Sequence, residues 1–285
     1  MSIFLVNSIP HARRREKVDS QELRNILGSY APISLEEMGR VKLMNRIDTK
    51  YILPRSILPS ILQDAQDAYF VQEINDNFIA SYDTLYYDTP DLEMYMLHHN
   101  RHLVRQKIRV RRYVESDLTF LEIKRKTNKG RTKKKRVRVD GFALRDDMQG
   151  YGKTEMPVGA FIDQYSNYHL VHLSPHLRTL FQRITLVNKT QKERLTIDIN
   201  LRWENQITGN KAEYPDLVIL ELKSDGHIRT KMAEILLAHH IHPFKISKYC
   251  VGTVLTTPHI KHNRFKTKIR RIEKMIKKDK LINNK

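Results

Sequence analysis

From residue 103 onward, hydrophobic and polar residues alternate with a period of two in six segments. These segments are Leu103–Tyr113, Leu118–Lys126, Lys134–Val139, Phe181–Val187, Arg194–Leu201 and Leu217–Lys223. Because successive side chains of a strand point to opposite faces of a sheet, the alternation predicts strands with one apolar face each. Further strands are expected in the first hundred residues, over Ile47–Leu53, Tyr69–Ile74 and Tyr82–Tyr87. The chain is therefore predicted to contain a large antiparallel sheet.

Apolar residues at helical spacing predict helices around these strands. Ser34 followed by Glu37 predicts a capped helix over Ser34–Met44, and Asp91 is the expected cap of a helix over Leu92–Asn100. The remaining helical segments are Ser20–Leu27, Arg55–Asp67, a largely helical insert near Lys153–Leu180, and His227–His240. No repeat or linker divides the chain. We therefore expect an N-terminal helical and basic segment (residues 1–32), one tunnel-like domain (33–258) and a basic C-terminal tail (259–285).

The polar faces of the predicted strands are strongly charged. Lys107, Arg109 and Arg111 share one face of their strand, opposite Ile108 and Val110. The other strands repeat this parity, with Glu122, Lys124 and Lys126; Lys134, Arg136 and Arg138; Arg194, Thr196, Asp198 and Asn200; and Glu221 and Lys223 on their polar faces. For a single strand, an ordinary sheet with one solvated face explains the pattern.

Repetition of the charged face on several strands favours a closed sheet. Like charges directly across neighbouring strands destabilise an open sheet. A barrel removes this conflict when its inner face binds a polyanion, and about eight strands leave an interior wide enough for one elongated ligand. We therefore predict an α+β fold, a closed antiparallel eight-stranded β-tunnel with helices packed on the outside.

The net charge points to an anionic partner. The 285 residues include 51 Lys and Arg against 32 Asp and Glu, a net charge of +19. Nucleic acid, anionic lipid and polyphosphate can each balance such an excess. The single cysteine excludes an internal disulfide and a Cys-rich metal site. No apolar stretch reaches the length of a membrane helix, and we expect a cytoplasmic protein, with contact at a membrane surface as an alternative.

Arginine and glutamate on one face suit phosphate chemistry. The guanidinium group binds phosphate oxygens through two parallel hydrogen bonds and keeps its charge when desolvated. Glu122 and Glu221 have two interpretations, ion-pair partners of the neighbouring cations or ligands of a hard divalent metal ion. Of the two, Glu221 is the better candidate ligand.

Seven short segments carry a family resemblance. They are Arg46–Tyr51, Tyr86–Pro90, Lys107–Tyr113, Phe120–Lys124, Arg194–Asp198, Leu220–Lys223 and Lys245–Tyr249. In this order they resemble the vacuolar transporter chaperone (VTC) domain, a polyphosphate polymerase module of the triphosphate tunnel metalloenzyme superfamily. The resemblance covers about Met44 to Thr253.

The resemblance implies a tunnel that binds the triphosphate of ATP and a growing polyphosphate chain. It implies a reacting centre formed by Lys124, Arg109, Arg111 and Lys248. Substrate-binding roles fall on Lys50, Arg46, Arg183, Arg194, Lys134, Arg136 and Ser247. The resemblance implies Glu221 as the ligand of Mn²⁺ or Mg²⁺, and Glu122 is a second candidate metal ligand from its position on the charged face.

Two positions depart from the superfamily's pattern. Many members that hydrolyse triphosphates begin with a Glu-x-Glu-x-Lys strand, where this chain has Arg46-Ile-Asp48-Thr-Lys50. The loss of the first acid favours a polymerase over a triphosphatase. Phe181 stands where the family tends to place a tyrosine, so a role for that hydroxyl is not expected here.

The expected activity is transfer of the γ-phosphate of ATP to polyphosphate. The alternatives are a metal-dependent triphosphatase, a non-catalytic polyphosphate-binding module and a nucleic-acid-binding module. No helix-turn-helix, zinc-finger or RNA-recognition signature is visible, so no specific nucleic acid is expected. In the tail, Ile269, Ile272 and Ile276 share one helical face. An amphipathic helix that contacts an anionic membrane or a membrane partner and a solvated terminus are both open.

Overall fold

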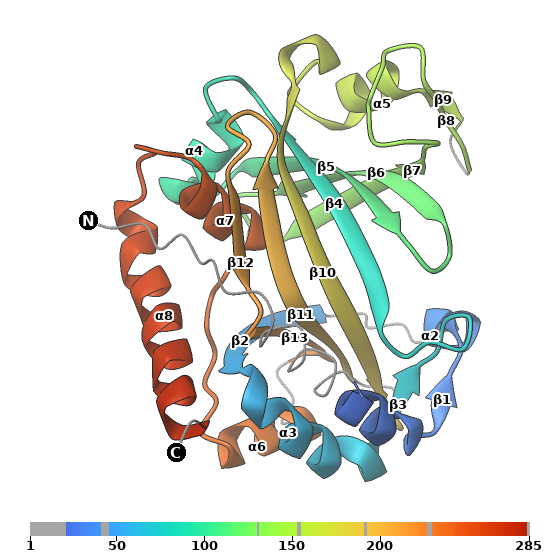
Figure 1. Cartoon of the computed structure of the whole chain (residues 1–285). Helices are drawn as coiled ribbons and strands as arrows, with labels where there is room; N and C mark the ends of the chain where they lie inside the picture. Colours follow the sequence, from blue (N-terminus) through green and yellow to red (C-terminus); the bar gives the residue numbers. More distant parts are fainter. Residues whose placement is uncertain are drawn as a thin grey trace.

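An eight-stranded antiparallel sheet forms the centre of the protein. The computed structural model describes residues 21–40, 46–129, 131–152, 155–190, 193–226 and 230–283. The strands lie in the order β2 (Arg46–Pro54), β13 (Leu217–Asp225), β11 (Glu193–Asn205), β10 (Ser174–Asn188), β4 (Ala80–Asp88), β5 (Arg105–Tyr113), β6 (Leu118–Lys126) and β7 (Thr132–Arg138) (Figure 1). The predicted α+β class and the antiparallel sheet are confirmed.

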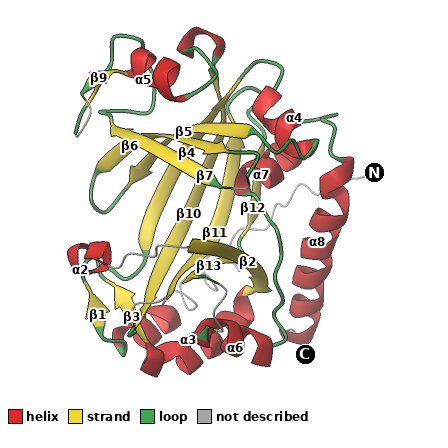
Figure 2. Ribbon diagram, turned by 180° about the vertical axis from the view of Figure 1, so that it is seen from behind, coloured by secondary structure: helices red, strands yellow, loops and turns green. Residues whose placement is uncertain are grey.

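The sheet is curved, and its two ends stand on either side of the long strands β10 and β4 (Figure 2). Among the described residues no backbone pairing joins β7 to β2. Closure of the sheet into a tunnel is therefore not observed and stays a prediction.

Shorter strands extend this sheet at its margins. β1 (Pro32–Ile33) pairs in parallel with β3 (Tyr69–Gln72), which also pairs with β10. β12 (Lys211–Tyr214) pairs with β11. A separate two-stranded sheet joins β8 (Gln149–Gly150) to β9 (Met156–Pro157).

The apolar face of each strand is covered by helices, as the alternation predicts. Leu195, Ile197 and Leu220 pack with α3 (Leu58–Ala65), α6 (Lys231–Ala238) and helical residues 21–28. At the other end of the sheet, Ile108, Leu121 and Val137 pack with α5 (Val158–Tyr165). The charged residues of the same strands therefore face away from these two core clusters.

A third cluster fills part of the charged face with helices from the C-terminal region. α7 (Lys248–Thr256) and α8 (Asn263–Asn283) pack there beside α4 (Glu93–His99), and Trp203 and Phe265 lie in the cluster. A side chain at Gly252 would collide with the ring of Trp203, so α7 can approach β11 only with a glycine at this position. The sequence pattern did not predict α7.

Several local predictions are settled by this arrangement. Ser34 and Glu37 form the predicted capping box at α2 (Leu35–Arg40), with the Ser34 N–H donating to Glu37 Oε2 at 2.9 Å. Asp91 was the wrong cap for α4, because Asp88 accepts the N–H groups of Met94 and Tyr95 instead. The helical prediction for residues 174–180 was also wrong, since β10 begins at Ser174.

The C-terminal basic segment is an amphipathic helix. In α8, Phe265, Ile269 and Ile272 are buried in the third cluster, and Ile276 packs against it. The solvated terminus is therefore not what the structure shows. The division into segments 1–32, 33–258 and 259–285 stays a prediction, and residues 1–20 lie outside the described part. None of the described helices combines the length and apolarity needed to cross a membrane.

Candidate functional site: a basic face on the curved sheet

The strand register brings the predicted cations together in rows across β5, β6 and β7. One row runs from Arg109 to Glu122 to Arg136, and the next runs from Lys107 to Lys124 to Lys134. Tyr86 and Thr84 on β4 stand opposite Arg109 and Arg111. The shared parity read from the sequence is therefore a shared face of the folded sheet.

Arg109 is held rigidly at this end of the site. Its Nε and Nη2 donate to Glu122 Oε2 at 2.8 and 2.5 Å, and its Nη1 donates to the Tyr86 hydroxyl at 3.1 Å. Lys134 forms a second ion pair with Glu122, whose side chain has an exposed fraction of 0%. Burial alone would raise the pKa of Glu122, but Arg109, Arg111 and Lys134 outweigh it and hold the pKa below its ordinary value. Glu122 is thus the buried anion that orients Arg109.

The neighbouring cations exceed the negative charge available. Arg111 donates to Thr84 Oγ1 at 3.0 Å, and its guanidinium carbon lies 5.4 Å from the Tyr82 ring centroid. Lys124 lies among these groups. Repulsion from Arg109, followed by burial, holds the pKa of Lys124 well below its ordinary value. A bound polyanion would relieve this repulsion, and it would favour the protonated lysine.

The second group of charges lies on β2 and β13. Glu221 pairs with Lys50 at 2.9 Å and with Lys223 at 3.5 Å. Its side chain keeps an exposed fraction of 22%, in contrast to the fully buried Glu122. Burial lowers the pKa of Lys223 to about 8, even though Glu221 acts in the opposite direction. Glu221 is therefore a carboxylate that a ligand can reach.

Asp198 links this second group to α7. Arg183 Nε and Nη2 donate to the two oxygens of Asp198 at 2.6 and 2.9 Å. Lys248, at the first position of α7, pairs with the same carboxylate. Burial would raise the pKa of Asp198, but Arg183 and Lys248 hold it below its ordinary value. Phe181 supplies a ring face to Lys248 with 4.9 Å between Nζ and the centroid, a contact that requires no hydroxyl.

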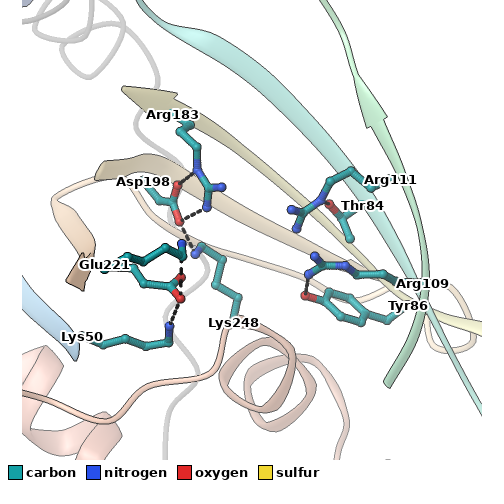
Figure 3. Close-up of polar contacts among 10 residues, drawn as sticks. Lys50, Thr84, Tyr86, Arg109, Arg111, Arg183, Asp198, Glu221 and Lys248 are labelled. Atoms are coloured by element: carbon teal, nitrogen blue, oxygen red, sulfur yellow. Dashed lines mark hydrogen bonds and ion pairs between the residues drawn. The ribbon is translucent and has the colours of Figure 1, made fainter. Parts of the chain in front are cut away.

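The two groups face each other. In Figure 3, the guanidinium groups of Arg109 and Arg111 point toward Arg183 and Lys248 from the opposite side. Lys107 joins the groups, because its Nζ donates to Ser247 Oγ at 2.9 Å. Cations from both ends of the sheet and from α7 thus converge on one region.

A buried carboxylate at the end of β4 fixes the position of α7. Asp88 Oδ1 accepts the N–H groups of Thr89 at 2.8 Å and Met94 at 2.9 Å. Its Oδ2 accepts the N–H of Tyr95 at 3.0 Å and the hydroxyl of Tyr249. Tyr249 follows Lys248 directly, so Asp88 ties the start of α7 to β4 and α4.

The carboxylates differ in how well they could hold a metal ion. No cluster of three or more His, Cys, Asp or Glu side chains able to bind a metal occurs among the described residues. Mg²⁺ and similar ions are commonly held by one or two carboxylates together with substrate phosphates. Glu221 fits this mode because it is accessible, whereas Glu122 has its oxygens committed to Arg109 and Lys134.

Most predicted site residues gather on this face. Arg109, Arg111, Lys124, Lys248, Lys50, Arg183, Lys134, Ser247, Glu221 and Glu122 take part in the contacts above. Arg194 stands opposite Lys223 on the adjoining strand, and Arg136 lies with its guanidinium carbon 4.7 Å from the Phe120 ring centroid. The side chain of Arg46 lies outside the described part. Their roles in binding and catalysis stay predictions.

Several contributing residues were not predicted as site residues. Asp198, Thr84, Tyr86, Lys107 and Lys223 all contact predicted ones. The alternation had placed Asp198, Lys107 and Lys223 on the charged face, so parity was the signal available for them. Asp88 lies in the Tyr86–Pro90 segment, but no local pattern indicated its contact with Tyr249.

Comparison with protein families gives a match to the VTC domain over residues 45–257. Because this match covers most of the chain, the protein belongs to the VTC domain family. The comparison with curated proteins found no match.

The solved structures that match this chain have low sequence identity to it. A candidate adenylate cyclase from Vibrio parahaemolyticus is 11% identical, covers 74% of this chain and 99% of its own, and has a TM-score of 0.42. A candidate adenylate cyclase from Bacillus halodurans is 12% identical over 72% and 96%, with a TM-score of 0.44. A candidate adenylyl cyclase from Hippeastrum, described as having a dominant triphosphatase activity, is 13% identical over 73% and 95%, with a TM-score of 0.38.

Proposed function

We propose that this protein is a polyphosphate polymerase-like enzyme that transfers the γ-phosphate of ATP to a growing inorganic polyphosphate chain. The observation that carries the proposal is the convergence of Arg109 and Arg111 with Arg183 and Lys248 around an accessible carboxylate, Glu221 (Figure 3). Membership of the VTC domain family supports the same substrate class. The curved sheet would enclose the polyphosphate. Closure of the sheet between β2 and β7 is part of the proposal.

The cations nearest the centre would clamp the reacting phosphates. Arg109 is fixed by Glu122 and Tyr86, and Arg111 is fixed by Thr84. Donors that are already oriented need no reorganisation when charge develops, and this makes them effective in stabilising a transition state. Lys124 and Lys248 would complete the clamp on the β- and γ-phosphates. Lys50, Arg46, Arg183, Arg194, Lys134, Arg136 and Ser247 would bind the remaining phosphates of ATP and the chain.

The reaction requires no nucleophile from the protein. A terminal oxygen of the polyphosphate chain attacks the γ-phosphorus in line, the bond to the β-phosphate oxygen breaks, and ADP leaves. An ionised phosphate oxygen is already nucleophilic, so positioning and charge stabilisation account for most of the catalysis. Glu221 would hold Mn²⁺ or Mg²⁺, which would supply positive charge close to the reacting phosphates.

The products formed from ATP test this proposal. Purified protein with ATP and Mn²⁺ is expected to give a ladder of polyphosphate on a gel. Arg111→Gln and Glu221→Gln should reduce chain synthesis by about 10²-fold or more, whereas Lys277→Gln on the exposed side of α8 should leave it unchanged. Orthophosphate without chains would make the protein a metal-dependent triphosphatase.

Binding measurements separate the remaining alternatives. Tight binding of polyphosphate without turnover in any metal would indicate a non-catalytic polyphosphate-binding module. If a single-stranded oligonucleotide competes with polyphosphate for binding as strongly as tripolyphosphate does, the protein is a nucleic-acid-binding module. A cytoplasmic location and a contact of α8 with an anionic membrane or a membrane partner stay predictions, and flotation with anionic vesicles tests the contact.

A further inference from the structure

The row of cations on β5 and β6 continues past the proposed reacting centre. Arg105 stands opposite Lys126 across the two strands, one step beyond Lys107 and Lys124. Because these positions differ by two along each strand, Arg105 and Lys126 lie on the same face as the central cations. Both side chains are half-buried.

Three more cations reach this end of the face from other segments. Lys245 precedes α7, Lys268 lies on α8, and Arg101 follows α4. Lys268 Nζ donates to the carbonyl oxygen of Lys245 at 2.8 Å. Figure 1 shows α4, α7 and the beginning of α8 together on one side of the sheet. We call Arg101, Arg105, Lys126, Lys245 and Lys268 the basic rim.

The members of the basic rim repel one another. Burial, followed by repulsion from Arg105 and Lys245, lowers the pKa of Lys126. Burial, followed by repulsion from Arg101 and Lys245, lowers the pKa of Lys268, against an opposing effect of Cys250. The cations from β5, β6, α8 and two loops therefore lie close enough together to affect one another's charge.

Some cations elsewhere on the surface have a carboxylate partner. Arg112 pairs with Asp117 at 2.7 Å, and Lys280 pairs with Asp216 at 2.8 Å. In the described part of the chain, no member of the rim forms an ion pair with a carboxylate. An anion from outside the chain is therefore the partner that the rim can accept.

The opposite end of the same strands has a different character. There the face carries mainly aromatic side chains, with ring centroids 5.1 Å apart between Tyr82 and Tyr113 and 5.9 Å apart between Tyr113 and Phe120. The face therefore has a direction, from an aromatic end through the central cations to the basic rim. A polyanion longer than a triphosphate gains more charge compensation toward the rim.

We propose that the basic rim binds a segment of polyphosphate that extends beyond the central site. The identity of the ligand rests on the proposed function, whereas the presence of a second anion-binding surface rests on the rim itself. Long chains would occupy both surfaces. Tripolyphosphate would occupy only the central site.

Binding as a function of chain length tests this inference. The rim variant is the triple substitution Lys126→Gln, Lys245→Gln and Lys268→Gln. Its matched control is Lys274→Gln, Lys277→Gln and Lys278→Gln, which removes the same charge from exposed positions on α8. Affinities of both variants and the unchanged protein are measured for tripolyphosphate, for polyphosphate of some tens of phosphates, and for a single-stranded oligonucleotide. A thermal melt confirms that each variant is folded.

The rim variant is expected to bind long polyphosphate about tenfold or more weakly while binding tripolyphosphate within about twofold of the unchanged protein. The dependence of log K on log salt for the long chain should become shallower by about 2, since each phosphate contact on a single strand contributes roughly 0.7. The control variant should show neither change.

Three outcomes would overturn the inference. They are equal losses in the rim and control variants, a loss of tripolyphosphate binding as large as that of long chains, and an equal dependence of oligonucleotide binding on the rim. A failure of the proposed function is separate. If the protein makes no chains from ATP but its binding still depends on chain length through the rim, the polymerase proposal is wrong and the inference about the rim stands.

Discussion

The two groups of charges on the basic face are balanced in different ways. On β2, β13 and β11, the carboxylates of Glu221 and Asp198 each pair with two cations. On β5, β6 and β7, Glu122 is the buried partner of Arg109 and Lys134, and Lys124 is left in repulsion with its neighbours. The first group therefore holds its cations in place without a ligand. The second group depends more on an incoming anion.

This difference assigns different tasks to the two groups. An accessible carboxylate beside two lysines can exchange those lysines for a metal ion that arrives with phosphate. A surplus of oriented arginines can bind only the phosphate oxygens themselves. Substitutions on the two groups should accordingly separate metal dependence from phosphate affinity.

The largest effect is expected from Arg111 and Arg109. Either Arg111→Gln or Arg109→Gln should lower kcat/KM for ATP by about 10²–10³, because each removes an oriented donor to the reacting phosphates. Their stabilities should differ. Arg109→Gln leaves Glu122 with only Lys134 and should lower the free energy of unfolding by about 3–5 kcal/mol, whereas Arg111→Gln leaves no carboxylate unpaired. Urea unfolding of both variants checks this contrast, and equal destabilisation would contradict the assigned role of Glu122.

The next largest effect is expected from Glu221→Gln, which should separate the metal dependence of the reaction from the affinity for phosphate. Chain synthesis is expected to fall by about 10²-fold as metal binding is lost. Binding of tripolyphosphate without metal should stay equal or become tighter, because Lys50 and Lys223 lose their competing carboxylate. Isothermal titration with and without Mn²⁺ measures both quantities. If the variant keeps the metal dependence of the unchanged protein, Glu221 is not a ligand of the metal ion.

Tyr249→Phe tests whether α7 must be fixed for Lys248 to act. The substitution removes one hydrogen bond to Asp88, at a cost of about 1–2 kcal/mol of stability. We expect kcat to fall several-fold with little change in KM, since the ring and its packing remain. Lys107→Gln serves as a comparison, because it removes a contact to Ser247 without touching Asp88. Stability loss with unchanged kinetics would make the Asp88 contact purely structural.

The smallest effect concerns pH. Lys223 has a pKa lowered to about 8, so it loses its charge as pH rises through that value. Phosphate binding favours the charged form, and affinity for tripolyphosphate should therefore fall between pH 7 and pH 9, by at most about tenfold over this whole interval from this group. Lys223→Arg keeps its charge over this range. Titration calorimetry should show a steeper fall for the unchanged protein than for Lys223→Arg, and parallel profiles would refute the involvement of Lys223.

Particular residues show how far the sequence could predict this site. Arg109, Arg111 and Lys124 were assigned from their alternation with Ile108 and Val110, because strand geometry alone fixes which side chains share a face. The capping box at Ser34 followed from two residues in one turn. Such local rules failed at Asp91, because the carboxylate of Asp88 reached over the start of α4 instead.

Contacts between distant segments were beyond those local rules. Lys248 meets Asp198, and Tyr249 meets Asp88, only because α7 packs into the curve of the sheet beside Trp203. Asn200, with a φ of 55°, coincides with the register shift between β10 and β11, where Leu201 and Trp203 turn to the cluster with α7. Nothing in the alternation of β11 announces this shift.

The sequence by itself determined the strands, the charged face that they share, and the family to which the chain belongs. Only the tertiary structure decided which carboxylate each cation meets, which glutamate stays accessible, and where the cations of the basic rim gather. The physical reason is that side-chain parity is set by local backbone geometry, whereas ion pairing and burial depend on segments that the fold brings together from far apart in the chain.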